Sequence, residues 1–377
     1  MSNKLENPND KNISNMDKID NFIRKNTKKH IINNLTADKI AIDLGTANTI
    51  IYKAQEGIVL DQPSIVAVKN EMGILIPIAF GDDAKLMLGR TPMNIIAIRP
   101  LKDGVIADFK VAESMIKYFM SQVIKNNKIL GMFLKPSVIV CVPSTSTSVE
   151  RRAIQDAAES AGVKECFLIE EPMAAAIGAG LSVTDASGSM VVDIGGGTTE
   201  IAVISLGGVV YGNSLRIGGD KMDDAIVSYI KKYHNLLIGD YTAEKIKKDI
   251  GCAMVDEHSA ETKIKIRGRG LIDGIPKEIV ITQSDIAMAL AECVEKIIEA
   301  IKVALESTPP ELSSDIVEKG IVLTGGGALL KNLDKAISTS VKLDVKIANN
   351  PLQCVARGSG FVLENIDKYH LIVFRQD

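Results

Sequence analysis

Two glycine-rich segments of the sequence share one pattern, in which an aspartate near the end of an apolar run is followed by glycine and hydroxyl residues. The residues of the two copies are Asp43, Gly45, Thr46, Ala47 and Asn48 in the first, and Asp193, Gly195, Gly196, Gly197 and Thr198 in the second. Glycine turns allow backbone N–H groups to approach a phosphate chain closely, because no side chain obstructs them. Two such turns facing each other could hold a β,γ-diphosphate between them.

The two aspartates favour a metal ion beside that diphosphate. Mg²⁺ keeps several of its waters and takes few protein carboxylates. We therefore predict that Asp43 and Asp193 hold Mg²⁺ through water. A single Asp-x-Gly turn is most often only a tight turn, so this prediction depends on the pattern occurring twice.

A third acidic residue, Glu171, follows the apolar run 167–169 and precedes Pro172, which is typical of the first turn of a helix. A carboxylate there could orient or deprotonate an attacking water, with the Thr198 hydroxyl helping to hold it. Mg²⁺ at Asp193 and the glycine amides would stabilise charge on the γ-phosphate. Glu171, Thr198 and Asp193 are thus the candidate catalytic residues. Alternatively, Glu171 only complements the helix dipole.

A third glycine cluster consists of Gly325, Gly326 and Gly327, which follow the apolar run 321–323. Glycines at this point would let a flat base lie against the backbone. The cluster lacks the Gly-Lys-Ser/Thr ending of a P-loop, and no cluster has the Gly-x-Gly-x-x-Gly spacing of a dinucleotide site. The cluster is therefore neither a P-loop nor a dinucleotide-binding loop.

The elements that position these residues alternate between short β-rich runs and helical stretches, as expected of an α/β fold. The two aspartates lie about one domain length apart. A duplicated domain explains this repeat, and a cleft between two similar lobes follows from it.

The composition excludes several classes of protein. The 44 basic and 47 acidic residues give a net charge of −3, which provides no positive field for nucleic acid, so we expect no nucleic-acid partner. The five cysteines have no metal-ligand spacing, and no apolar run reaches the length of roughly 18 residues that spans a membrane. We therefore expect a cytoplasmic protein whose residues 1–37, rich in Asn, Lys and Asp, form a flexible N-terminal extension.

Four segments together resemble the MreB family of bacterial actins. They are Glu171–Gly180, Asp193–Glu200, Gly218–Asp223 and Leu323–Leu330. The resemblance extends from about residue 39 to residue 367. It implies an actin-like α/β fold, in which two duplicated ribonuclease-H-like lobes with four subdomains surround a nucleotide cleft.

The resemblance also implies domain boundaries. Lobe I would comprise residues 38–190, with subdomain IB at about 70–107 and the remainder forming IA. Lobe II would comprise residues 191–347, with subdomain IIB at about 219–283 and the remainder forming IIA. Residues 348–377 would form a C-terminal helix that returns to lobe I, and a tail.

The family's ligands are ATP or ADP with Mg²⁺, and its binding positions match residues of this sequence. Gly45–Asn48 and Gly195–Thr198 match the two phosphate loops, and Gly325–Gly327 match the adenosine loop. Glu244 and Lys247 match the residues that grip the ribose and base, on a helix expected between Thr242 and Gly251. The pair thought to arrange the hydrolytic water matches Glu171 and Thr198.

A membrane contact is implied by the apolar stretch 129–134, which lysines flank on both sides. It resembles the membrane-inserting loop of the family, and the lysines would suit anionic head groups. The candidate membrane residues are Leu130, Met132, Phe133 and Leu134. Alternatively, the stretch folds back onto the core.

The resemblance implies an ATPase whose hydrolysis is coupled to filament dynamics. The chain would assemble with itself as paired protofilaments on the inner face of the cell membrane and determine cell shape. Other MreB-type proteins or membrane-anchored shape proteins would be its partners. A second hypothesis stays open, in which the chain is a low-turnover nucleotide-binding scaffold that copolymerises with or regulates other filaments, for shape or motility in a wall-less cell.

Overall fold

The computed structural model describes residues 38–124, 128–129, 132–133, 135–255 and 262–375. The predicted extension 1–37 lies outside the described residues, as do Leu130 and Leu134. For residues 128–129 and 132–133 the structure gives the backbone alone.

The first large sheet has the strand order β12-β11-β1-β2-β3. Its strands are β1 (Lys39–Leu44), β2 (Asn48–Lys53), β3 (Gly57–Pro63), β11 (Ser137–Val142) and β12 (Glu165–Glu170). β1 pairs antiparallel with β2 and parallel with β11, so the turn after Asp43 connects the central hairpin of the sheet.

The second large sheet has the strand order β15-β14-β13-β19-β20, which matches the order of the first sheet read in the opposite direction. Its strands are β13 (Ser189–Ile194), β14 (Thr199–Ser205), β15 (Gly208–Leu215), β19 (Ile321–Thr324) and β20 (Val345–Ile347). β13 pairs antiparallel with β14 and parallel with β19, as β1 does with its neighbours. The two sheets therefore have one topology, and the predicted duplication is confirmed.

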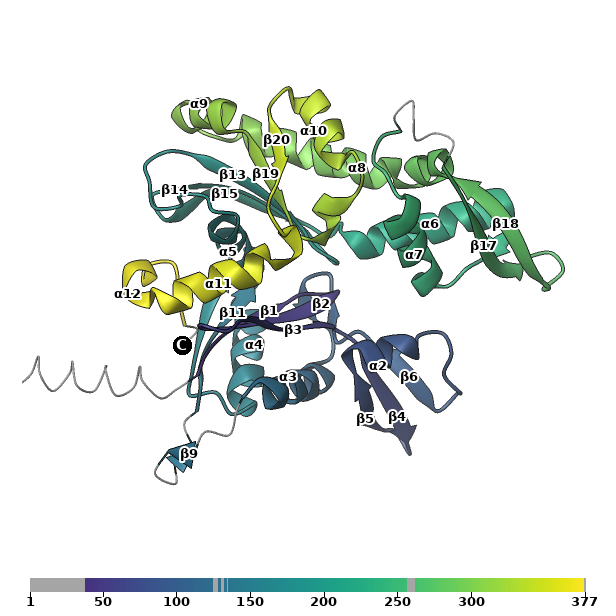
Figure 1. Cartoon of the computed structure of the whole chain (residues 1–377), viewed down its shortest axis with the longest axis horizontal. Helices are drawn as coiled ribbons and strands as arrows, with labels where there is room; N and C mark the ends of the chain where they lie inside the picture. Colours follow the sequence, from purple (N-terminus) through teal and green to yellow (C-terminus); the bar gives the residue numbers. More distant parts are fainter. Residues whose placement is uncertain (1–37, 125–127, 130–131, 134, 256–261, 376–377) are drawn as a thin grey trace, which may run out of the picture.

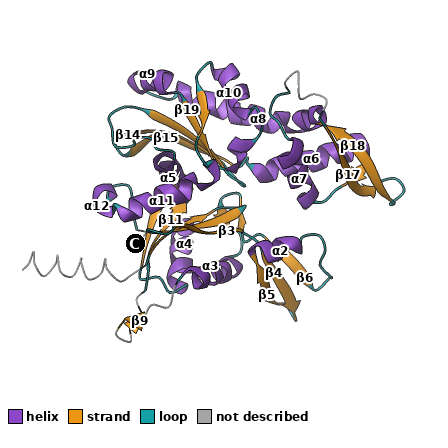
Figure 2. Cartoon of the chain, viewed as in Figure 1, coloured by secondary structure: helices purple, strands orange, loops and turns teal. Residues whose placement is uncertain are grey.

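Helices separate and flank the two sheets (Figure 1). The helices of the first lobe are α3 (Phe109–Val123) and α4 (Ser148–Ser160), and those of the second are α8 (Gln283–Glu306), α9 (Pro310–Lys319) and α10 (Leu333–Val341). Each lobe has its own apolar core, built from one sheet and its helices. The secondary structure in Figure 2 shows the resulting layers of helix and sheet.

Two helices, α5 (Glu171–Gly178) and α11 (Cys354–Glu364), lie between the sheets and share a third apolar core with both of them. Their backbones approach so closely that a Cβ at Gly178 would lie 1.8 Å from the carbonyl oxygen of Cys354. Gly358 is equally constrained, by the carbonyl oxygen of Ala174 at 1.9 Å. The chain after the second sheet is therefore held against the first lobe. It continues through α12 (Ile366–Tyr369) to a single bridge between Phe374 and Leu168.

Each lobe carries a smaller outer subdomain on the same side of the molecule (Figure 1). The first outer subdomain, residues 66–99, contains β4 (Val66–Glu71), β5 (Ile74–Phe80), α2 (Gly81–Leu86) and β6 (Ile95–Ile98). The second, residues 219–282, contains α6 (Gly219–His234), β16 (Leu236–Leu237), α7 (Asp240–Ile250), β17 (Lys263–Gly270) and β18 (Pro276–Thr282). The exact domain boundaries expected from the sequence stay predictions.

The predicted start of the helix at Thr242 is wrong, because α7 begins at Asp240. Gly239 is its N-cap residue, and the Gly239 carbonyl accepts hydrogen bonds from the backbone N–H groups of Thr242 and Ala243. Gly239 has extended backbone angles, which a residue before a helix commonly adopts. The predicted end is confirmed, since Gly251 is the C-cap residue.

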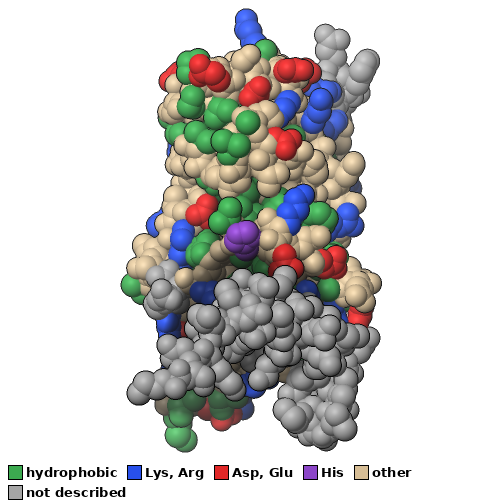
Figure 3. Space-filling view, turned by 90° about the vertical axis from the view of Figure 1, so that its left-hand side faces the viewer, with side chains coloured by type: hydrophobic (Ala, Val, Ile, Leu, Met, Phe, Trp, Pro, Cys, Tyr) green, Lys and Arg blue, Asp and Glu red, His purple; other side chains and the backbone are tan. Residues whose placement is uncertain are grey.

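The surface carries both signs of charge. On the face in Figure 3, Lys and Arg side chains are interspersed with Asp and Glu side chains over the described part of the chain. None of the helices among the described residues is both long enough and apolar enough to cross a membrane.

Candidate functional site

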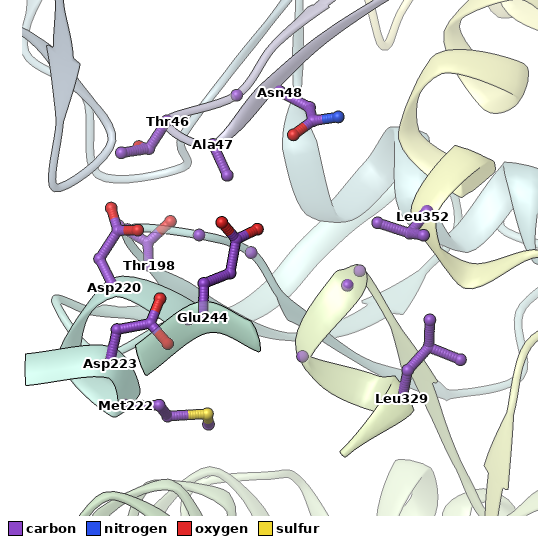
Figure 4. Close-up of a pocket in the computed structure, with 18 of the residues that line it drawn as sticks. Thr46, Ala47, Asn48, Thr198, Asp220, Met222, Asp223, Glu244, Leu329 and Leu352 are labelled. Atoms are coloured by element: carbon purple, nitrogen blue, oxygen red, sulfur yellow. The ribbon is translucent and has the colours of Figure 1, made fainter. Parts of the chain in front are cut away.

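A cleft of about 580 Å³ lies between the two lobes. It is lined by all of the residues that were predicted to bind nucleotide or to act in catalysis, namely Asp43, Gly45, Thr46, Ala47, Asn48, Glu171, Asp193, Gly195, Gly196, Gly197, Thr198, Glu244, Lys247, Gly325, Gly326 and Gly327. In Figure 4, the side chains of three residues of the first lobe, Thr46, Ala47 and Asn48, lie opposite Thr198 and Glu244 of the second lobe. Folding therefore gathers segments that are far apart in the sequence around one cavity.

The two glycine turns, 45–48 and 195–198, lie directly against each other. A Cβ at Gly196 would lie 2.6 Å from the Cβ of Ala47, and a Cβ at Gly197 would lie 2.6 Å from the Thr46 hydroxyl oxygen. Real Cβ atoms essentially never approach other atoms this closely. These two positions therefore require glycine because the opposite lobe occupies the space, and not only because the chain turns.

Hydrogen bonds hold both turns in shape. The Ser64 hydroxyl donates to the Gly45 carbonyl at 2.6 Å, and the Gly195 N–H donates to the Thr198 carbonyl at 2.8 Å. The first turn of α6 also supports the second glycine turn. The Gly219 N–H donates to the Gly195 carbonyl at 3.0 Å, and the Asp220 N–H donates to the Gly196 carbonyl at 2.8 Å.

Three carboxylates, those of Asp43, Asp193 and Glu171, lie together at the floor of the cleft. Burial raises the pKa of Asp43 to about 8, and the negative charges of Asp193 and Asp61 add to this rise. Burial also raises the pKa of Asp193 to about 6, although the Thr324 hydroxyl, which donates to it at 2.8 Å, acts in the opposite direction. The pKa of Glu171 is raised well above its usual range, by burial and then by the charges of Glu200, Asp43 and Asp193.

These carboxylates suit a divalent cation. Every charged group that shifts the pKa of Asp43, Asp193 or Glu171 is itself negative. A cation placed among them would offset their mutual repulsion, and carboxylate oxygens are ligands that Mg²⁺ accepts. The donor set therefore fits the predicted magnesium ion, while the individual ligand roles stay predictions.

The sequence analysis missed Glu200, which lies in β14 behind Glu171 and is only 1% exposed. Its carboxylate accepts a hydrogen bond from the Ser144 hydroxyl at 2.7 Å and another from the Ser214 hydroxyl. Ser144 belongs to the first lobe and Ser214 to the second, so this buried group ties the lobes together. The sequence did offer one signal for this residue, since Glu200 is the only charged residue of the mostly apolar strand β14.

The other end of the cleft suits a flat, partly apolar group. Gly325 has a φ of +78°, and a Cβ at Gly327 would lie 2.2 Å from the Ile194 side chain, so the third glycine cluster packs tightly on β13. Leu329 and Leu352 form an apolar wall beside it (Figure 4). This arrangement is what a nucleobase lying against backbone requires.

Glu244 and Lys247 project from α7 and are already hydrogen-bonded to protein groups. The Lys247 ammonium donates to the Gly219 carbonyl at 2.6 Å and pairs with the Asp223 carboxylate at 2.9 Å. The Glu244 carboxylate accepts from Lys85 at 2.9 Å and from Lys248 at 2.6 Å. The sequence analysis missed Lys85 and Asp223 as lining residues, because their partners lie on another element, α7. It also missed Lys248, whose pairing with Glu244 one turn earlier on α7 has the spacing of an ordinary helix-surface ion pair.

The predicted membrane segment lies apart from the cleft. Met132 and Phe133 form β10 (Met132–Phe133), which pairs with β9 (Lys128–Ile129) as a short antiparallel ribbon. In Figure 1 this ribbon projects from the first lobe at the end opposite the outer subdomain. Its backbone therefore forms a projection and does not fold back into the first large sheet.

Comparison with known proteins agrees with this architecture. The family model described as MreB/Mbl protein matches residues 37–371. The cell shape-determining protein MreB of Escherichia coli strain K12 is 53% identical over 345 residues, which are 90% of this chain and 97% of that protein. The cell shape-determining protein Mbl of Bacillus subtilis strain 168 is 49% identical over 332 residues, 88% of this chain and 97% of that protein.

Solved structures show the same fold. The crystal structure of MreB 5 of Spiroplasma citri bound to AMPPNP has a TM-score of 0.82 and 37% identity, and covers 89% of this chain and 98% of that chain. The MamK double helical filament, at 20% identity, shares the fold with a TM-score of 0.74, covering 87% of this chain and 99% of that chain. The match over nearly the whole folded region, together with the duplicated actin-like architecture, shows that this chain belongs to the MreB/Mbl family.

Proposed function

We propose that this chain binds ATP with Mg²⁺ between its lobes, hydrolyses it, and polymerises into membrane-associated filaments that determine cell shape. The observation that carries the proposal is the contact between the two glycine turns in the same cleft as the carboxylates of Asp43, Asp193 and Glu171. The relatives named cell shape-determining proteins and the AMPPNP and ADP complexes of MreB 5 support it.

Phosphate binding follows from the two glycine turns. Gly45–Asn48 and Gly195–Thr198 supply backbone N–H groups from opposite lobes to one diphosphate. Because the turns contact each other across the cleft, a phosphate chain bound by both draws the lobes into one arrangement. Asp43 and Asp193 would hold Mg²⁺ through water, and the bound ion would supply positive charge against the phosphate oxygens.

The hydrolytic step depends on Glu171. Burial and the charges of Glu200, Asp43 and Asp193 raise the pKa of Glu171 well above its usual range, which disfavours its ionised form. With a cation bound beside Asp43 and Asp193, the Glu171 carboxylate would be favoured in its ionised form, which can accept a proton from water. The Thr198 hydroxyl lies across the same cavity, where it holds that water. A loaded cleft therefore favours the form of Glu171 that can act as a general base.

Closure of the lobes links this chemistry to assembly. A ligand that binds the closed arrangement more tightly shifts the population toward it, and the subunit conformation that the filament prefers is favoured in turn. Hydrolysis removes that preference and weakens the lattice. The structure of the MamK filament supports assembly for this fold.

The test is ATP-dependent pelleting of the purified chain, with phosphate release measured in the same tubes. We expect polymer to form with ATP and to release phosphate. Tight ATP binding without pellet or phosphate would contradict the proposal. It would favour the low-turnover scaffold that regulates or copolymerises with other filaments.

The membrane contact is proposed for the projecting ribbon of β9 and β10. Met132 and Phe133 form its second strand, and Lys135 lies two residues after Phe133, as suits an anionic lipid surface. The double substitution Met132→Ser, Phe133→Ser should release filaments from anionic liposomes. Ile272→Ser, at an 85% exposed apolar residue of the second outer subdomain, is the control and should leave cosedimentation unchanged. Persistent cosedimentation of the double variant would contradict the assignment.

A further inference from the structure

Among the described residues, three side-chain contacts join the two outer subdomains across the mouth of the cleft. The Lys85 ammonium of α2 lies 2.9 Å from both carboxylate oxygens of Glu244 of α7. Arg99 pairs with Asp220 of α6 at 3.1 Å. The Arg90 guanidinium lies over the ring of Tyr241, 5.9 Å from its centre. Each contact therefore has its cation in the first lobe and its partner in the second.

The Lys85–Glu244 pair differs from an ordinary surface ion pair. Both side chains are only about one-fifth exposed, and both line the cleft. Partial burial raises the pKa of Glu244, but hydrogen bonds from Lys248 and Lys85 outweigh this effect and lower the pKa to about 2. The carboxylate is therefore ionised, and it accepts from a lysine of each lobe.

The two lysines have different geometric consequences. Lys248 lies one turn after Glu244 on the same helix, so it moves with Glu244 whenever the second lobe moves. Lys85 belongs to the first lobe, so its 2.9 Å contact with Glu244 depends on how far apart the two lobes lie. A carboxylate has about four lone-pair sites, and two lysines leave acceptor sites for ligand hydroxyl groups.

We propose that Lys85 is a positioning residue, which orients the Glu244 carboxylate toward the ribose of the nucleotide only when the lobes are closed. This inference rests on the proposed function, because it concerns the same cleft. It makes ribose recognition depend on closure, so that the sugar is bound tightly only after the phosphates have drawn the lobes together.

The test compares a ligand that has a ribose with one that does not. Affinities of the full chain for Mg²⁺-ATP and for Mg²⁺-tripolyphosphate are measured by isothermal titration calorimetry. Lys85→Gln should weaken ATP binding about tenfold, equivalent to about 1.4 kcal/mol, and change tripolyphosphate binding less than about twofold. Lys85→Arg, which keeps the charge, should restore most of the ATP affinity.

Two further variants separate orientation from a general loss of charge. Lys69→Gln removes a lysine from an exposed ion pair with Glu71 in the same outer subdomain, so ATP affinity should not change. In a chain that already carries Glu244→Gln, adding Lys85→Gln should cost less than about twofold, because no carboxylate remains to be oriented. This cycle uses differences between variants, so a uniform loss of stability does not imitate it.

Each outcome has one meaning. Equal losses for ATP and tripolyphosphate in Lys85→Gln, or additive losses in the double variant, would overturn the positioning role and leave the proposed function intact. If the unmodified chain binds neither ligand, the proposed function itself fails. Small-angle X-ray scattering gives an independent readout, since Lys85→Gln with ATP should stay more open than the unmodified chain with ATP.

Discussion

The floor and the mouth of the cleft are built in different ways. The floor consists of the two glycine turns, whose backbones touch across the lobes, and the buried carboxylates of Asp43, Asp193 and Glu171. The mouth consists of ion pairs between side chains that solvent partly reaches, Lys85–Glu244 and Arg99–Asp220. Both connect the same two lobes.

Because of this difference, we expect the floor to determine the chemical step and the mouth to determine how the nucleotide enters and leaves. Close backbone contacts tolerate almost no displacement, because even one added methyl group would collide with the opposite turn. Partly exposed ion pairs typically contribute between about 0 and 1 kcal/mol, so they can break and re-form as the lobes move. We therefore expect changes at the floor to abolish function and changes at the mouth to alter the rate and selectivity of binding.

The largest effect is expected from Gly196→Val. Its Cβ would lie 2.6 Å from the Cβ of Ala47 and would force the two glycine turns apart. We expect ATP affinity to fall about 100-fold or more, which corresponds to at least about 2.8 kcal/mol, in calorimetric titrations. Gly239→Ala is the control, because its added Cβ meets no atom within 4 Å. Near-normal affinity of Gly196→Val would refute the rigid floor.

Glu171→Gln should separate binding from hydrolysis. The amide keeps the size of the side chain but cannot accept a proton from water, so phosphate release should fall about 100-fold or more. ATP affinity should change little. The control is Glu170→Gln, at the neighbouring residue, whose carboxylate pairs with Arg151 at 3.5 Å. Unchanged phosphate release in Glu171→Gln would support the alternative in which Glu171 only complements the helix dipole.

The floor should also make the nucleotide-free chain sensitive to pH. The pKa values of Asp43 and Asp193 are raised to about 8 and about 6 in the folded chain, above the ordinary value of 3.8. At pH values between 3.8 and about 8, the folded chain binds more protons at these aspartates than the unfolded chain does. The free energy of unfolding therefore falls as the pH rises toward 8.

Thermal unfolding of the nucleotide-free chain checks this expectation. The melting temperature should decrease from about pH 6 to about pH 8, and Asp43→Asn should flatten the decrease. Adding ADP with Mg²⁺ should also reduce the pH dependence of the melting temperature, because the cation would take the place of the protons on Asp43 and Asp193. A melting temperature that rises over this range would contradict the raised pKa values.

The smallest effect is expected from Arg99→Gln at the mouth. Arg99 and Asp220 are each about one-third exposed, so their ion pair contributes little. Its loss in Arg99→Gln should speed nucleotide release only about twofold. Stopped-flow displacement measures this rate, and added salt should speed release more in the unmodified chain than in the variant. Arg267→Gln, at an exposed ion pair on β17, serves as the control. A change as large as that of Gly196→Val would remove the distinction between floor and mouth.

Much of the floor was predictable because its residues occur in repeated local patterns. Each glycine turn follows a strand of its own lobe, and Glu171 lies between a strand and a proline-containing helix start. Their roles in binding and hydrolysis stay predictions, although the structure places them around one cleft. Glu200 was missed because its two hydroxyl partners lie far from it in the sequence, Ser144 in a loop of the first lobe and Ser214 in β15 of the second.

The ion pairs of the mouth were not predictable from the sequence. Glu244 was named through the family resemblance, but its partner Lys85 is 159 positions away and no local pattern connects the two. An ion pair of this kind depends on how the two outer subdomains are held over the cleft. The helix start at Thr242 was wrong for a related reason, since the backbone of Gly239 and not a hydroxyl side chain forms the cap.

The sequence by itself determined the duplication, the α/β class and the two aspartate–glycine turns. These features depend on short-range chemistry, because strand periodicity and the freedom of glycine act within a few residues. Only the tertiary structure decided that Gly196 meets Ala47, that Glu200 ties the lobes, and that Lys85 reaches Glu244. Such contacts depend on the packing of α5 and α11 between the sheets, which sets the distance between the lobes for every residue of the cleft.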